Sequence, residues 1–145
     1  MKYCQTQGTR ILTLALKKGD DLLESVQQAC EKKKIYGGSI ISGIGALSQC
    51  YLGYFDLDSR EYRTITINEP VELVNTSGTI TLTENGKAFP HIHLIVANSK
   101  SQCFGGHAMS GCLISVTAEL MVLGFEKPLT RKLDPETNLM LLDPD

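Results

Sequence analysis

Two neighbouring segments, Phe89-Pro-His-Ile-His-Leu94 and Cys103-Phe-Gly-Gly-His-Ala-Met109, contain all three histidines of the chain: His91, His93 and His107. Successive side chains of a β-strand point to opposite faces, so His91 and His93 share one face, about 6.5–7 Å apart. The residues between the two segments are mostly turn formers. They predict a β-hairpin that brings His107 back beside the other two histidines.

The register of this hairpin decides how the third imidazole joins the pair. If Ala97 pairs with Cys103, His93 lies opposite His107, and a ladder shifted by two residues places His91 there instead. A shift by one residue would turn His107 to the other face. Neutral imidazole is a common ligand of Zn²⁺, and three protein ligands leave a fourth position open. We therefore predict a three-histidine site for zinc or another divalent metal; histidines that hold no metal, on the surface or in the core, are the alternative.

The composition is that of one globular domain spanning residues 1–145. Hydrophobic residues make up 42% of the chain and charged residues 21%, which is ordinary for a soluble protein that buries a core. The net charge is −2, and the one basic run, Lys32-Lys33-Lys34, is best interpreted as a helix C-terminus. This balance argues against a broad surface for nucleic acids, whose non-specific binding depends on Lys and Arg.

The five cysteines are odd in number and form no Cys-x-x-Cys motif, which favours a reducing, cytoplasmic compartment. Cys103 lies four residues before His107, about 13 Å along a strand, so we exclude it from the metal site. Residues 1–8 lack the apolar core of a signal peptide. The longest apolar stretch, Cys112 to Phe125, is too short and too polar to cross a membrane.

One helix and several strands are predicted. Helical spacing of apolar residues over Asp21 to Lys33, with aspartates at its start and Gly37-Gly38 beyond its end, predicts a helix. Gly43-Ile44-Gly45 predicts a turn or bulge that interrupts a buried run beginning at Ser39. The expected strands are 10–16, 39–42, 46–55, 62–67, 71–83 and 112–123.

Asn85-Gly86 is a strong signal for a two-residue type I′ hairpin turn. The register it implies places Ile80 opposite His91 and Gly78 opposite His93. A glycine facing a metal ligand would leave room for a ligand or substrate, so Gly78 is a candidate ligand-adjacent residue. A bulge or twist point is the equal alternative.

The strand from Cys112 to Leu123 is predicted to have one wholly apolar face, and its other face carries Glu119. A carboxylate in the middle of a buried sheet is costly unless it is paired, so Glu119 is a candidate general base or hydrogen-bond partner of a metal ligand. A charge on a solvated face or at a subunit interface is the alternative interpretation. Both interpretations also apply to Glu72. The apolar face consists of Ile114, Val116, Ala118, Leu120 and Val122.

The order of several motifs resembles the PPC domain, the plant and prokaryote conserved domain, over nearly the whole chain. The motifs are Gly19-Asp-Asp-Leu-Leu-Glu24, Ile41-Ser-Gly-Ile-Gly-Ala46, Glu72-Leu-Val74, Gly86-Lys87 leading into His91-Ile-His-Leu94, Phe104-Gly-Gly-His107 and Val116-Thr-Ala-Glu-Leu120. The resemblance implies an α+β fold with a large, mostly antiparallel, twisted sheet, one main helix and a homotrimer. It also implies a metal held by His91, His93 and His107. Gly105 and Gly106, which precede His107, are candidate ligand-adjacent residues.

Three functions follow as hypotheses. The first is a metal-dependent binding protein or enzyme, in which a small ligand occupies the metal's open position or Glu119 assists hydrolysis. The second is a DNA-binding or transcription-associated protein, because the plant members of the family bind DNA through an AT-hook; this sequence contains no such segment. The third is a structural trimer in which the metal only fixes a hairpin.

Overall fold

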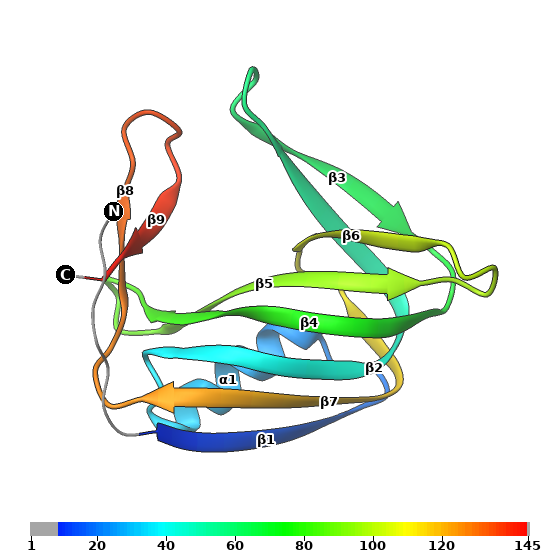
Figure 1. Cartoon of the computed structure of the whole chain (residues 1–145), viewed down its shortest axis with the longest axis horizontal. Coiled ribbons are helices and arrows are strands. Elements are labelled where there is room, and N and C mark those ends of the chain that lie inside the picture. The colour runs from blue at the N-terminus through cyan, green and yellow to red at the C-terminus, as the bar shows by residue number, and fades with distance from the viewer. Residues whose placement is uncertain (1–8, 145) are drawn as a thin grey trace.

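The computed structural model describes residues 9–144, which form one helix and a nine-stranded sheet (Figure 1). The α+β prediction is therefore confirmed. The elements are β1 (Thr9–Lys17), α1 (Leu22–Lys33), β2 (Gly38–Asp56), β3 (Glu61–Ile67), β4 (Val71–Leu82), β5 (Ala88–Ala97), β6 (Cys103–Ala108), β7 (Leu113–Phe125), β8 (Thr130–Leu133) and β9 (Met140–Asp143). No helix among the described residues is long and apolar enough to span a membrane.

The long strand β2 organises the sheet. Its first half pairs with β7 and β4, and its second half pairs with β3 and β6. Because β4 also pairs with β5 and β5 with β6, the strands β2, β4, β5 and β6 close into a ring. All these pairings are antiparallel. The predicted interruption at Gly43-Ile44-Gly45 does not break the strand: these three residues pair regularly with β7, and register shifts lie before them, between Ile40 and Ser42, and after them, from Gly45 onward. Ile41 and Ser42 are exposed rather than buried.

Helix α1 covers one face of the sheet, where the core lies (Figure 1). It begins where expected: Asp21 is the N-cap and accepts a hydrogen bond from the Glu24 amide. Lys32 and Lys33 occupy its last turn, which confirms the interpretation of the basic run. The buried residues Leu22, Val26 and Cys30 face the sheet side chains Ile40, Leu120 and Val122 among others.

The other face of the sheet is uncovered in the single chain. On β1, β2, β5 and β7, exposed residues on this face alternate with buried ones on the core face. Several of the exposed residues are large and apolar. They include Ile11, Ile41, Ile44, Val74, Ile95, Val116 and Met121, which are 44% to 72% exposed.

The β4–β5 register differs by one residue from the sequence prediction. Thr79 lies opposite His91 and Ser77 opposite His93, while Gly78 pairs with Ile92. The loop contains three residues rather than two: the Gly86 amide donates to the Thr83 carbonyl, and Thr83 and Lys87 close the ladder. Gly86 alone has positive φ here, +76°, which is a type I turn followed by a left-handed residue. The type I′ prediction was therefore wrong.

The predicted apolar face of β7 is interrupted at Val116. Ile114, Ala118, Leu120 and Val122 are buried, but Val116 is 72% exposed. Leu47 pairs with Ile114 and Gly45 with Ala118, so β7 has extra residues opposite Ala46. This bulge turns Val116 away from the core.

Candidate metal centre

The β5–β6 hairpin brings the histidines together in the first of the two registers considered from the sequence. Ala97 pairs with Cys103, and His93 pairs directly with His107. The turn is held by Asn98, whose side-chain oxygen accepts hydrogen bonds from the amides of Lys100 and Gln102. Ser101 takes the left-handed conformation that the turn requires.

The three imidazoles converge. Ring centroids lie 5.2 Å apart for His91 and His93, 4.9 Å for His91 and His107, and 5.4 Å for His93 and His107. One ring nitrogen of each histidine lies within 4.8 Å of the other two. Side-chain rotations that move each nitrogen by about 1 Å would place all three at about 2.0–2.1 Å from a central zinc ion, the length of a zinc–nitrogen bond.

The surroundings keep the rings of His91 and His107 in the form that binds metal. Burial, Arg131 and the other two histidines lower the pKa of His91 to about 4, and burial, His93 and Arg131 lower that of His107. Both rings are therefore neutral at pH 7, as metal coordination requires. Nδ1 of His107 is buried with no hydrogen-bond partner among the described residues. An orphaned imidazole nitrogen in a three-histidine cluster fits a bound cation.

Two residues that sequence reasoning missed border the histidines. The centre of the Tyr62 ring lies 5.2 Å from the centre of the His107 ring. Gly53 pairs with His107 on β2, and its lack of a side chain leaves room for the Tyr62 ring. A Cβ at Gly53 would lie 2.9 Å from the Tyr62 ring. Arg131 of β8 places Nη2 3.0 Å from Nδ1 of His91. Burial lowers the pKa of Arg131, but a guanidinium remains charged at neutral pH.

The glycines named from the sequence take different positions. Gly105 and Gly106 line a hollow of about 400 Å³ beside His93, together with Asn75 and Ser77. Gly78 does not face a histidine side chain. It lies between β2 and β5, where an added Cβ would overlap the carbonyl oxygen of His91. Its role is close approach of the backbones rather than space for a ligand.

The family model that matches the chain is the Plants and Prokaryotes Conserved (PCC) domain, over residues 3–126. The chain belongs to this family. The matched residues include all three histidines, which lie at positions 91, 93 and 107, and end before β8 and Arg131.

Solved structures share the fold of this PCC-domain protein. A metal-containing protein from Archaeoglobus fulgidus is 29% identical with a TM-score of 0.89, covering 99% of both chains. A plant- and prokaryote-conserved (PPC) protein from Pyrococcus horikoshii is 27% identical with a TM-score of 0.89, covering 99% of this chain and 97% of that one. A protein from Ralstonia eutropha described as a candidate DNA-binding protein is 26% identical with a TM-score of 0.81, covering 90% and 89%.

A curated relative is larger than the PCC-domain chain. The bifunctional protein GlmU from Synechococcus sp. (strain JA-3-3Ab) is 31% identical over 138 residues, which are 94% of this chain and 21% of that protein. The chain therefore spans about a fifth of the length of this relative.

The carboxylates proposed from the sequence lie elsewhere in the PCC domain. Glu119 pairs with Ile44 and Ala15 and lines a hollow that Glu72 also borders. Its strand, β7, is separated from β5 by β2 and β4, so Glu119 lies three strand spacings, about 14 Å, from the row of His91 and His93. The fold of one chain does not bring Glu119 to the histidines.

Proposed function

We propose that this PCC-domain protein binds a divalent metal, zinc first, through His91, His93 and His107. The observation that supports this proposal is the convergence of one nitrogen from each histidine within 4.8 Å. The name of the metal-containing relative from Archaeoglobus fulgidus points the same way. Three neutral imidazoles leave zinc its full charge and one open position, where it can bind a small ligand or polarise a water or carbonyl group.

Metal content tests the proposal directly. Protein purified without a tag and without chelator is expected to contain about one metal per chain by elemental analysis, and His93→Ala should lose most of it. Cys103→Ser is the matched control, because Cys103 is exposed on the same hairpin and is not part of the cluster. Equal metal content in wild type and His93→Ala would contradict the ligand assignment.

Of the two functions considered for the metal, we propose that it binds a ligand rather than catalyses hydrolysis. A general base must reach the attacking water at about 3 Å, and Glu119, the base considered from the sequence, lies about three strands from His91 and His93. Glu119→Gln is therefore expected to leave metal content unchanged. A drop to the level of His93→Ala would place Glu119 in the site after all.

The assembly we propose is a homotrimer. The number of subunits is what the resemblance to the PPC domain implies, and the support within the chain for self-association is the uncovered sheet face, whose large apolar residues include Ile11, Ile44, Val116 and Met121. Exposed apolar patches of this kind are typical of protein interfaces. The face also carries Glu119 and Glu72, which fits the subunit-interface interpretation of both acids.

DNA binding is the alternative function, which the description of the Ralstonia eutropha relative favours. The charge of this chain argues against DNA binding, because the chain has 14 Lys and Arg against 16 Asp and Glu and so has no excess of cations to bind phosphates. A gel shift at moderate salt is expected to show no complex at micromolar protein. A complex that persists under these conditions would favour the alternative.

A further inference from the structure

Arg131 is bonded to neutral groups on every side. Its Nε donates to Thr81 Oγ1 at 3.2 Å, Nη1 to the Met140 carbonyl at 2.8 Å, and Nη2 to Thr79 Oγ1 at 3.0 Å. Nη2 also lies 3.0 Å from Nδ1 of His91, and the guanidinium carbon lies 5.4 Å from the centre of the Phe89 ring. These partners include no carboxylate, so within residues 9–144 the charge of a half-buried guanidinium has no counter-ion beside the histidines.

The contact with His91 has a defined chemical sense. Arginine can only donate, so Nδ1 of His91 must supply its lone pair to Nη2. A neutral imidazole has one lone pair to give. If a metal takes it at Nδ1, Arg131 loses its acceptor, and if a metal binds Nε2, the proton moves to Nδ1 and Arg131 again has no acceptor. Metal binding through His91 therefore frees a cationic N–H group at the edge of the site.

We infer that Arg131 makes the metal centre a binding site for a small anion with a carboxylate or phosphate group. This inference rests on the proposed metal binding. A divalent ion held by three neutral imidazoles and a guanidinium without a counter-ion form a positive cluster, and an oxyanion satisfies both. A guanidinium N–H suits carboxylate and phosphate oxygens, which take a short, charge-assisted hydrogen bond from it.

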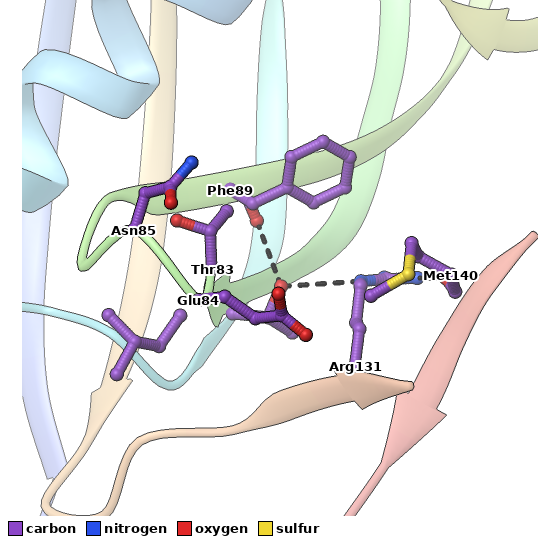
Figure 2. Close-up of a pocket in the computed structure, with 8 residues that line it drawn as sticks. Thr83, Glu84, Asn85, Phe89, Arg131 and Met140 are labelled. Atoms are coloured by element: carbon purple, nitrogen blue, oxygen red, sulfur yellow. Dashed lines mark hydrogen bonds between the residues drawn. The ribbon is translucent and has the colours of Figure 1, made fainter. Parts of the chain in front are cut away.

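A pocket on the far side of Arg131 fits the rest of such a ligand. It has a volume of about 250 Å³, and Leu82, Phe89 and Met140 supply its apolar lining (Figure 2). Phe89 pairs with Thr81, and His91 pairs with Thr79, so the pocket adjoins the histidine site along β4 and β5 with Arg131 between them. Glu84 also lines the pocket, but it is exposed and has no ion pair with Arg131 within residues 9–144. A small organic acid or phosphate ester matches this combination.

The test measures anion binding rather than activity. Wild type, Arg131→Met and Lys132→Met are loaded with zinc or cobalt, and inorganic phosphate and acetate are titrated separately by calorimetry, with the visible spectrum of the cobalt form as a second readout. Lys132 is the next residue of β8 and is exposed, so its variant removes the same charge away from the site. Arg131→Met should weaken anion binding about 10- to 100-fold, since a hydrogen bond to a charged group contributes about 1.5–3 kcal/mol. Lys132→Met should change it less than about twofold, since a rim-exposed charge contributes little.

The outcomes separate this inference from the metal proposal. Equal anion affinity in wild type and Arg131→Met, or no anion binding by metal-loaded wild type, overturns the role of Arg131 and leaves metal binding intact. Wild type that holds no metal overturns the proposed function itself. If Arg131→Met does not fold, Arg131→Gln keeps donors for Thr79 and Thr81 without the charge and gives the same comparison. Whichever anion binds in the two titrations, phosphate or acetate, identifies whether the ligand carries a phosphate or a carboxylate group.

Discussion

His91 is a residue that the fold keeps uncharged. Its pKa falls from 6.5 to about 4, first because of burial and then because of Arg131 and the other histidines. Between these two pH values the unfolded chain binds more protons than the folded chain, so the free energy of unfolding decreases as the pH falls. With chelator present, we expect a loss of at most about 1.4 kcal/mol per pH unit from pH 6.5 to 4.

Urea unfolding at several pH values measures this dependence. His91→Gln removes the titrating group, so its stability should fall less steeply over the same pH window, while the carboxylates titrate equally in both proteins. If the free energy of unfolding depends on pH in the same way for wild type and His91→Gln, the fold does not lower the pKa of this histidine.

Gly78 is a residue whose lack of a side chain sets the geometry under His91. An alanine Cβ there would overlap the His91 carbonyl oxygen, whereas at Gly105 it would meet the Leu94 carbonyl oxygen at 3.2 Å. Overpacking typically costs about 1–3 kcal/mol, or about 2–4 °C of Tm per kcal/mol for a chain of this size. Gly78→Ala should lower Tm by several degrees and Gly105→Ala by less. Equal Tm values for the two variants would argue against the close approach of β4 and β5.

Single residues also show what sequence can predict about a site. Strand alternation and one hairpin register place His93 opposite His107, because both rules are local. Tyr62 and Arg131 reach the same histidines from β3 and β8, which join the site through pairings far apart in the sequence. Their neighbours along the chain carry no signal of this, so local patterns could not find them.

The start of α1 is an element-scale feature with a measurable effect. Asp21 accepts a hydrogen bond from the Glu24 amide at 3.0 Å, and its second oxygen accepts one from the Gly111 amide at 2.7 Å. Asp21→Ala removes the N-cap and leaves a second amide without its acceptor, so we expect a loss of about 1–3 kcal/mol. Asp58→Ala, at an exposed acid in the β2–β3 turn, should change stability by less than about 0.5 kcal/mol. Thermal unfolding compares the two, and equal effects would show that Asp21 is not a structural cap.

The β4–β5 hairpin shows why registers are harder to predict than strands. Both strands were expected, and both exist. Asn85-Gly86 favours a two-residue turn, but Thr83 and Lys87 bond through backbone and side chain, which closes a three-residue loop instead. The extra loop residue shifts every pair by one position and moves Gly78 from His93 to Ile92. A hydrogen bond between residues four apart thus decides which side chains face the site.

For the molecule as a whole, hydrophobic periodicity predicts the single helix and most of the strands because it is a strong local signal, whereas the fold class is what the resemblance to the PPC domain implies. The sequence does not predict that β2 is one strand from Gly38 to Asp56. The strand continues through its register shifts because β4 and β7 pair with it on either side, and the sequence of β2 alone does not show these pairings. The same bulges turn Ile44 and Val116 outward. A strand pattern alone would bury Val116, so the uncovered apolar face is a consequence of the tertiary structure.

This face gives the prediction that concerns the whole molecule. If it is the trimer interface, a charge at its centre should separate the subunits without unfolding them, because Val116 is 72% exposed in the single chain and contributes little to its core. Val116→Lys should therefore elute as a monomer with wild-type secondary structure when mass is measured by light scattering. Leu57→Lys is the matched control: Leu57 is 73% exposed, but it lies in the β2–β3 turn, away from the sheet face. It should remain a trimer. If Val116→Lys keeps the wild-type mass, the subunits associate through another surface, and the apolar residues around Ile44 need a different partner.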